Sequence, residues 1–181
     1  MTATHESLLQ AVRSWVLLAT SLPAGQVIPT DDHGTRPPLP YITVTLTTFD
    51  LEQGTDEQVL SVDDDALVEA VRGHRRATIS LNAYGKRGAD LLALCHASLS
   101  QTVVKQHLHD ARITLTSAGQ TQDISSLVDT AIEKRFVKDF YLDYAFETDA
   151  KTVPHLETFA LEVGADDNPE FTNSLTIHLE A

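Results

Sequence analysis

The sequence predicts an α+β fold: a twisted, mostly antiparallel sheet with two main helices packed on one face, followed by a C-terminal β-hairpin or arm. Three observations support this prediction. Residues 5–21 have the apolar spacing of a helix, residues 134–148 alternate as a half-buried strand does, and shorter alternating runs lie between them. With 181 residues, the chain is long enough for one domain with its own hydrophobic core.

The first helix is predicted over residues 5–21, with Thr4 as its N-cap. One face of this helix carries the apolar side chains that should pack flat on the sheet, and these are Leu8, Leu9, Val12, Trp15, Val16 and Ala19. Pro23 and Gly25 end it.

An extended segment and several strands follow. Val27 and Ile28 predict a short strand, and residues 31–34 a turn. Pro37, Pro38 and Pro40 fix the backbone of residues 35–41 and exclude a helix there, so this segment leads rigidly into a strand. Strands are predicted over residues 40–50, 57–63, 66–73 and 75–84, although residues 66–71 would also suit a helical turn.

The second half begins with a helix over about 87–101, whose apolar face contains Ala89, Leu92, Leu99 and either Cys95 or His96. A short third helix over 102–109, a strand over 113–116 and a turn over 119–121 follow. Residues 124–130 are ambiguous and suit a helical turn. In the strand predicted over 134–148, one face is apolar except for Lys138.

The last thirty residues contain two alternating runs, 156–163 and 174–179, separated by a turn over 164–169. They predict a hairpin that either folds as a unit of its own or pairs as an arm with the sheet edge of a neighbouring subunit. The predicted organisation is therefore a domain over 1–150 and a C-terminal hairpin or arm over 151–181.

The net charge of −13 is concentrated locally, because residues 50–69 contain eight acids and no base. One interpretation is a solvated face that maintains solubility; another is an anionic surface that repels DNA passing close by. Binding to nucleic-acid phosphates, which requires clustered Lys and Arg, is disfavoured.

The side chains that could support chemistry do not form a recognisable catalytic or cofactor motif. Cys95 lies in an apolar helical run and is predicted to be a buried hydrophobe, consistent with a reducing cytoplasm. His107 and His109 would diverge on a helix, which disfavours a metal site, and Gly85 to Gly88 form a turn without the full phosphate-binding pattern. We predict no cofactor, no metal and no membrane insertion, since the N-terminus has no basic segment before its short apolar run.

Two motifs carry a resemblance to a known family. The first is Thr35-Arg36-Pro37-Pro38-Leu39-Pro40-Tyr41 before a strand, and the second is the strand that ends in Asn82-Ala83-Tyr84-Gly85 before a helix. In this order, after an N-terminal helix, they resemble the tail-terminator (neck-terminator) proteins of tailed bacteriophages over roughly residues 5–150.

The resemblance implies a structural virion protein and not an enzyme. Such proteins form a six-subunit ring, cap the head-proximal end of the tail tube, stop its polymerisation and face the neck connector. The implied partners are further copies of the chain, the tube protein and the connector, with the sheath added if the tail is contractile. DNA would pass through without specific binding, and the protein would be assembled in the host cytoplasm.

Two groups of site residues follow from this implication. Contacts between subunits or with the neck are predicted for Arg36, Pro37, Pro38, Tyr41, Arg72, Arg75 and Arg76. The three clustered arginines would pair with carboxylates of this chain or of an adjacent subunit. Acids predicted to face the channel are Asp50, Glu52, Asp56, Glu57, Asp63, Asp64 and Asp65.

Two alternatives remain open at the level of the sequence. The chain could be a small soluble enzyme or ligand-binding α+β domain with an unrecognised site. It could also be another structural component of the neck or tail, such as a connector or tube protein.

Overall fold

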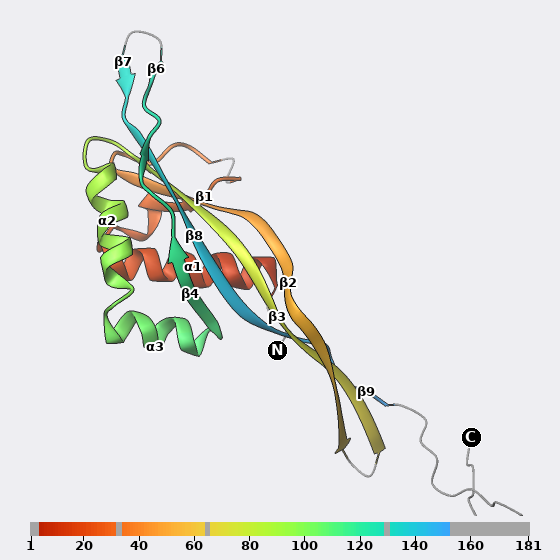
Figure 1. The fold of residues 1–181 in the computed structure, drawn as a ribbon. Helices are drawn as coiled ribbons and strands as arrows, with labels where there is room; N and C mark the ends of the chain where they lie inside the picture. Colours follow the sequence, from red (N-terminus) through yellow and green to blue (C-terminus); the bar gives the residue numbers. More distant parts are fainter. Residues whose placement is uncertain (1–3, 32–33, 64–65, 129–130, 153–181) are drawn as a thin grey trace, which may run out of the picture.

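The computed structural model of the protein describes residues 4–31, 34–63, 66–128 and 131–152. In this part of the chain a mostly antiparallel sheet carries three α-helices on one face (Figure 1). The main sheet has the strand order β1-β2-β3-β8-β4, in which β1 (Val27–Pro29) runs parallel to β2 and the other neighbours are antiparallel. The predicted fold class is confirmed.

Helix α1 (His5–Thr20) begins at the predicted cap. Thr4 Oγ1 accepts a hydrogen bond from the Ser7 amide at 3.2 Å, and Ser7 Oγ accepts one from the Thr4 amide at 2.9 Å. This reciprocal pair satisfies amides that a helix start leaves unpaired. A short 3₁₀ helix, η1 (Ala24–Gln26), connects α1 to β1.

The core lies between the helices and the sheet. Trp15 on α1 is fully buried, and its ring and that of Phe140 form a T-shaped pair with the centroids 5.1 Å apart. The Trp15 indole N–H donates to Ser98 Oγ at 3.0 Å, which satisfies its polar atom inside the core.

Strands β2 (Tyr41–Asp63) and β3 (Ala66–Tyr84) form one long hairpin, where the sequence predicts four shorter strands. The irregular composition of residues 50–57 is absorbed by register shifts near Thr48, Leu51 and Gln53 and by positive φ at Asp50 and Gly54. β-Bulges of this kind allow the strand to bend while its hydrogen-bonded pairing with the neighbouring strand continues on either side. The helical turn considered for residues 66–71 is wrong, since this segment belongs to β3.

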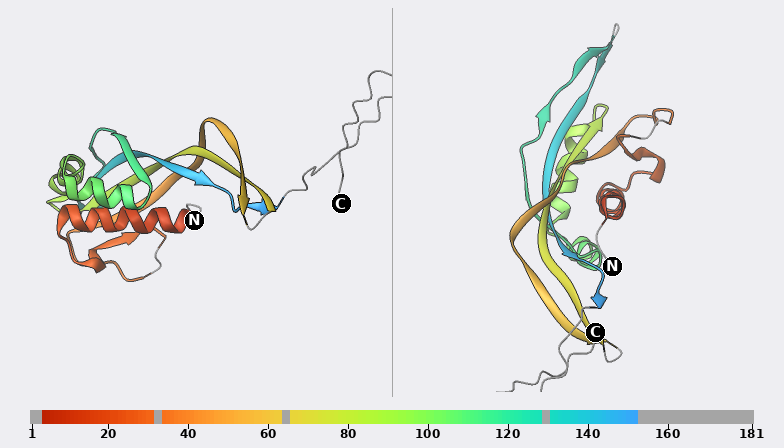
Figure 2. Two further views of the ribbon diagram at one scale, coloured as in Figure 1. Left: turned by 90° about the horizontal axis from the view of Figure 1, so that it is seen from below. Right: turned by 90° about the vertical axis from the view of Figure 1, so that its right-hand side faces the viewer.

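The outer part of this hairpin, residues 51–63 and 66–74, extends beyond the helix-covered body and is called the arm below (Figures 1 and 2). Strand β9 (Lys151–Thr152) pairs with Val68 and Glu69 of the arm. The C-terminal hairpin predicted for 156–163 and 174–179 lies outside the described residues.

Helices α2 (Gly88–Ser98) and α3 (Thr102–Asp110) confirm the two helical predictions after β3. The buried face of α2 is rotated from the predicted one, because Leu91 and Ser98 are buried while Ala89 and Leu99 are only partly so. The cause is the close approach of Gly88 to the sheet, where an added Cβ would lie 2.7 Å from Phe136 Cδ2.

The remaining strands complete the sheet and add a small second one. Strands β4 (Ile113–Ala118) and β5 (Gln122–Asp123) pair with β8 (Arg135–Glu147). The predicted apolar face of β8 is buried from Lys138 to Tyr144 and half-buried at Phe136 and Phe146. The helical turn considered for residues 124–130 is wrong over the described residues 124–128, because β6 (Ser126–Val128) pairs with β7 (Ala131–Glu133) as a projecting hairpin. Within the described residues, the helices are too short or too polar to cross a bilayer.

Candidate interaction surfaces

A buried arginine organises the base of the arm. The Arg75 guanidinium donates to both carboxylate oxygens of Asp56 at 2.6 Å and to Asp50 Oδ1 at 3.1 Å. It also lies over the Phe146 ring, 4.6 Å from the centroid. The hydrogen bonds from Arg75 lower the pKa of Asp56 below its usual range, and Asp56 in turn raises the pKa of Arg75. Arg75 thus connects β3 to β2 where the arm begins.

The backbone around this cluster is shaped to admit it. Asp50 has φ +62°, at the irregular point where β2 leaves the body. A Cβ at Gly73 would overlap the Asp56 carboxylate and come within 2.6 Å of Arg75 Nη1. A side chain at position 73 would therefore displace the ion pair.

The two neighbouring arginines also pair within the chain. Arg76 donates to the two Asp143 oxygens at 2.7 and 3.0 Å, and Arg72 pairs with Glu147 at 2.9 Å. These bonds lower the pKa of Glu147, chiefly through Arg72, and raise that of Arg76. Of the two kinds of pairing predicted for these arginines, the structure contains the intrachain one; contact with another subunit stays a prediction.

The proline segment ends in an aromatic stack. Tyr41 and Tyr84 lie parallel with centroids 4.5 Å apart, and the Leu39-Pro40 peptide bond is cis. Arg36 is highly exposed and forms an ion pair with Glu133 at 2.8 Å. Arg36 and Pro38 therefore present accessible side chains, as a contact would need, whereas the Tyr41 ring is buried in the stack and its pKa is raised by that burial.

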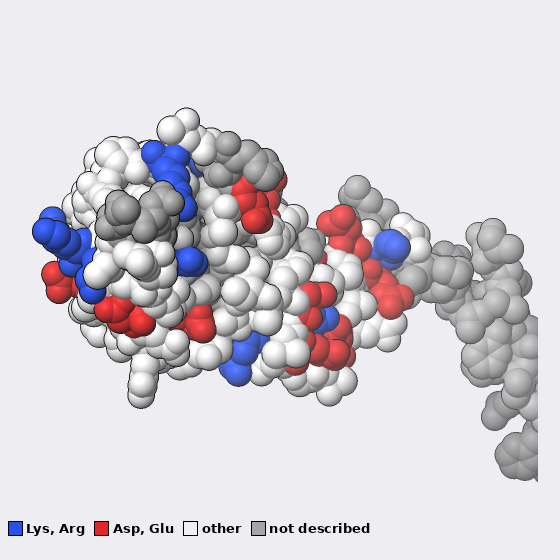
Figure 3. All heavy atoms as spheres, turned by 90° about the horizontal axis from the view of Figure 1, so that it is seen from above, with Lys and Arg blue, Asp and Glu red and all other residues white. Residues whose placement is uncertain are grey.

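The predicted channel-facing acids have different surroundings. Asp50 and Asp56 bind Arg75, whereas Glu52 and Glu57 are exposed on the arm. In Figure 3 acidic side chains recur along the arm with basic ones between some of them. Residues 64 and 65 and the side chain of residue 63 lie outside the described part of the structure.

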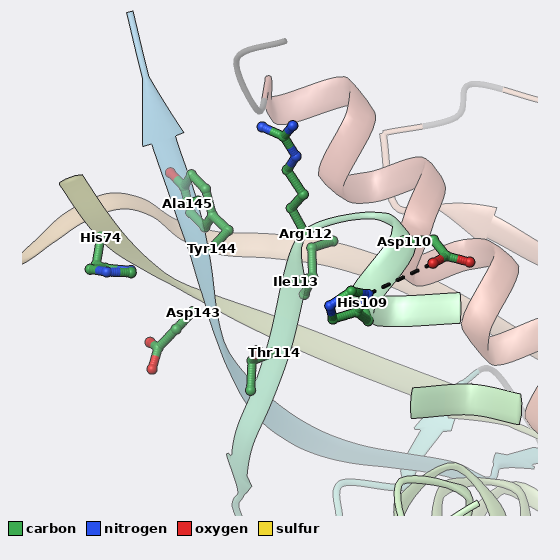
Figure 4. A pocket seen from close by; sticks show the side chains of 9 residues that line it. All are labelled: His74, His109, Asp110, Arg112, Ile113, Thr114, Asp143, Tyr144 and Ala145. Carbon is green, nitrogen blue, oxygen red and sulfur yellow. Dashed lines mark ion pairs between the residues drawn. The ribbon is translucent and has the colours of Figure 1, made fainter. Parts of the chain in front are cut away.

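The largest pocket described, about 630 Å³, lies where β3, β8, β4 and α3 meet (Figure 4). Its polar side chains point in different directions, and the Asp143 carboxylate is held by Arg76. His109, also in its wall, lies 3.8 Å from Asp110, whereas His107 is directed to the Ala11 carbonyl at 3.4 Å. The two histidines of the sequence motif therefore diverge, and the pocket does not gather groups around a reacting centre.

Two apolar surfaces were not predicted from the sequence. Leu127 and Ile132 are exposed on the β6–β7 hairpin, and Leu108 and Leu115 contribute to a groove of about 450 Å³ between α3 and β4. Strands of three residues are too short for an alternation of apolar and polar side chains to be recognised. A groove is formed by segments that lie apart in the sequence, so its lining cannot be read from a local pattern.

Comparison with known proteins identifies the family. No curated protein matches the sequence. The family model described as "Phage neck terminator protein" matches residues 6–167, which includes the whole body, the arm and the β6–β7 hairpin. This family consists of structural virion proteins that interact with other head and tail components. The chain therefore belongs to the phage neck terminator proteins.

Proposed function

We propose that this protein caps the head-proximal end of the phage tail tube as a closed ring of identical subunits, six in number. In that position it ends polymerisation of the tube and joins the tail to the neck connector. Membership of the family supports a location in the neck and a role as a terminator. The ring, its number of copies and the surfaces that join it to the tube and the connector are proposals.

The observation that best supports a ring is that one small domain carries interaction elements at opposite ends. The arm extends from one end of the body and the β6–β7 hairpin from the other (Figure 1). In the described part of the chain, β4 is the last strand of its sheet and its outer edge is unpaired. Closed rings require two different surfaces per subunit, and this domain offers them.

The acidic arm suits a lumen through which DNA moves. Glu52 and Glu57 are exposed there, and like charge keeps a polyanion from adhering to the wall. Salt screens such charges over about 8 Å at physiological ionic strength, so only acids close to the duplex would act. Asp50 and Asp56 would contribute less, because Arg75 offsets their charge.

Electron microscopy of cognate tail tubes mixed with the purified protein tests this proposal. We expect one ring at the head-proximal end and no further growth when tube protein is added afterwards. The matched control is the tube without the protein, which should continue to grow. Decoration along the tube wall, or native mass spectra of the bound form containing only monomers or twofold dimers, would contradict the proposal.

A further inference from the structure

Basic side chains gather at the end of the body that lies opposite the arm. Strand β3 runs from the arm to a turn that carries Lys86 and Arg87 (Figure 1). In this turn the Gly85 amide donates to the Lys134 carbonyl at 2.9 Å, and Arg135 follows at the start of β8, which pairs with the end of β3. The surface formed by Lys86, Arg87, Lys134 and Arg135 is called the basic patch below.

Three of the four cations in the basic patch have no carboxylate partner in the described part of the chain. Lys86 and Arg87 are exposed, and the ion pairs found there involve neither of them. Arg135 donates to the Asn82 side-chain oxygen at 2.9 and 3.3 Å, and this acceptor is neutral. Three positive charges are therefore available to an anionic partner.

The acids around the basic patch do not cancel this charge. Lys134 pairs with Asp123 at 3.7 Å, and Glu133 pairs with Arg36 at 2.8 Å, so each of these acids is already offset within the chain. Asp90, in the first turn of α2, is exposed and offsets one further charge. The basic patch thus remains positive in a chain whose net charge is −13.

The segment that follows β9 has the complementary composition. Residues 153–167, called the acidic segment below, contain Glu157, Glu162, Asp166 and Asp167 and no Lys or Arg. They lie outside the described residues, but the match to the neck terminator family continues through them to residue 167. The acids of the arm suit the basic patch less well, because arginines of the same chain pair with several of them.

An exposed leucine adds an apolar contact beside the basic patch. Leu39 is 61% exposed, and a Cβ added at Gly85 would lie 3.5 Å from Leu39 Cδ2, so this side chain borders the turn that carries Lys86. The acidic segment contains the alternating apolar run 156–163. The two surfaces therefore match in apolar character as well as in charge.

The reach of the acidic segment favours the basic patch of another copy. The segment begins directly after β9, which pairs with the arm at Glu69. From Glu69 to Tyr84 at the end of β3 the distance along the strand is about 50 Å, at about 3.3 Å per residue. Even in a fully extended chain, Glu157 and Glu162 lie within only about 17 and 34 Å of Thr152. Most of the acidic segment is thus too short to reach the basic patch of its own copy.

We propose that the acidic segment of one copy binds the basic patch of the next copy. This inference rests on the ring proposed above and names one of its contacts. The contact is head-to-tail, because the segment leaves the arm at one end of the chain and the patch lies at the other end, as a closed ring requires. Exposed ion pairs contribute little one at a time, so binding depends on several charges together. In an assembled ring the short tether to the arm also raises the effective concentration of the segment.

Zero-length coupling of the full chain tests this contact. Isotopically light and heavy chains are mixed in equal parts, assembled on cognate tail tubes and treated with a water-soluble carbodiimide, which joins an amine to a neighbouring carboxylate with loss of water. Mass spectrometry then identifies the linked peptides. We expect Lys86 to be linked to carboxylates of the acidic segment, with light–heavy pairs as frequent as light–light and heavy–heavy pairs together. Lys105, exposed on α3, is the internal control and should give no such links.

A charge reversal gives the matched comparison. Arg87→Glu should reduce the Lys86 links about tenfold, because it places a negative charge beside the reacting amine. Helix α2 should still form, since a carboxylate is favourable at a helix start, and circular dichroism checks this. Lys105→Glu makes the same change of charge elsewhere and should leave the Lys86 links unchanged.

The other outcomes each contradict a defined statement. Links within single copies alone, links from Lys86 to Glu52 or Glu57 of the arm in place of the acidic segment, or rings without Lys86 links would overturn the inference and leave the proposed function standing. Ring formation is scored separately by electron microscopy. Tubes without rings would reject the proposed function, and the inference with it.

Discussion

At the scale of single residues, stability depends on a few polar groups that the core must satisfy. Ser98 is the main example. It is buried, accepts the Trp15 indole N–H at 3.0 Å and donates to the Cys95 carbonyl at 2.7 Å, so it connects α1 to α2 through one hydroxyl. Leaving a buried donor without its acceptor costs more free energy than the hydrogen bond contributed to stability.

Ser98→Ala should therefore destabilise the protein by about 1–3 kcal/mol, because the Trp15 N–H is left unpaired in the core. Urea unfolding followed by tryptophan fluorescence measures this change at the only tryptophan of the chain. Ser100→Ala, at an exposed position two residues away, is the matched control and should change stability little. Equal effects of the two substitutions would show that the Ser98 hydroxyl has no special role.

Arg75→Gln should lower stability at neutral pH and alter its pH dependence. The pKa of Asp56 is lowered in the folded protein, so its contribution is present above the unfolded value near pH 4 and is lost as the pH falls through the folded pKa. The difference in urea midpoint between wild type and variant should thus narrow from pH 7 to pH 3. Lys86→Gln, in an exposed turn, should show no such narrowing.

Arg36→Glu tests the predicted contact of the proline segment. The Arg36 side chain is exposed, and the ion pair described for it is with Glu133 at the end of β7, so the domain should fold normally. A surface pair of this kind contributes little to stability. If Arg36 meets another subunit or the neck, tails completed with this variant should decrease in a head–tail joining assay. Normal joining with a folded variant would remove Arg36 from the contact.

At the scale of helices and strands, the sequence is most informative where one pattern of apolar residues repeats over a long segment. The helical spacing of residues 5–21 and the alternation of 134–148 predicted α1 and β8 closely, because eight or more residues repeat one pattern. The sequence predicts two strands, 40–50 and 57–63, where the structure has the single strand β2, because bulges around Asp50 and Gly54 interrupt the alternation. The Arg75 cluster could be expected as an ion pair, but its partners Asp50 and Asp56 depend on register, which composition does not fix.

The junction of β3 and α2 gives a prediction at this scale. A Cβ at Gly88 would lie 2.7 Å from Phe136 Cδ2 and 2.8 Å from the Ala83 carbonyl oxygen, which belongs to backbone and cannot easily move. Gly88→Ala should therefore shift α2 away from the sheet and cost about 1–3 kcal/mol. Gly25→Ala, where nothing lies within 4 Å of the added Cβ, should be nearly neutral in the same thermal unfolding measurement. If Gly88→Ala leaves the unfolding temperature unchanged, the first turn of α2 can move enough to accommodate the added methyl group.

At the scale of the whole molecule, the role of a neck terminator depends on contacts with other head and tail components, and a single sequence contains little information about such contacts. Family membership defines the neck and the terminator role, while Leu127 and Ile132, the groove between α3 and β4 and the arm are exposed surfaces of the single copy. The exposed apolar pair Leu127 and Ile132 cannot be recognised from the spacing of apolar residues, because the two side chains become neighbours only through strand pairing.

The acidic arm gives a prediction for the assembled particle. Glu52→Gln together with Glu57→Gln removes exposed charge while leaving the Arg75 cluster with Asp50 and Asp56 intact. If these carboxylates face the channel, rings should form normally and DNA should leave more slowly in an ejection assay, most visibly at low salt. Glu6→Gln on α1 serves as the control. Ejection at the wild-type rate would assign the arm acids to a solvated outer face.

The regular pairing of β2 with β3 from Glu57–Arg72 to Asp63–Ala66 makes the reach of the arm adjustable. Because side chains alternate with a period of two, inserting two residues in each strand lengthens a ribbon by about 7 Å and keeps every side chain on its original face, whereas inserting one reverses the faces beyond it. The packing of the body would be unaffected, because the inserted residues lie in the arm. A terminator could in this way be fitted to tubes of different width by changing one hairpin in even steps.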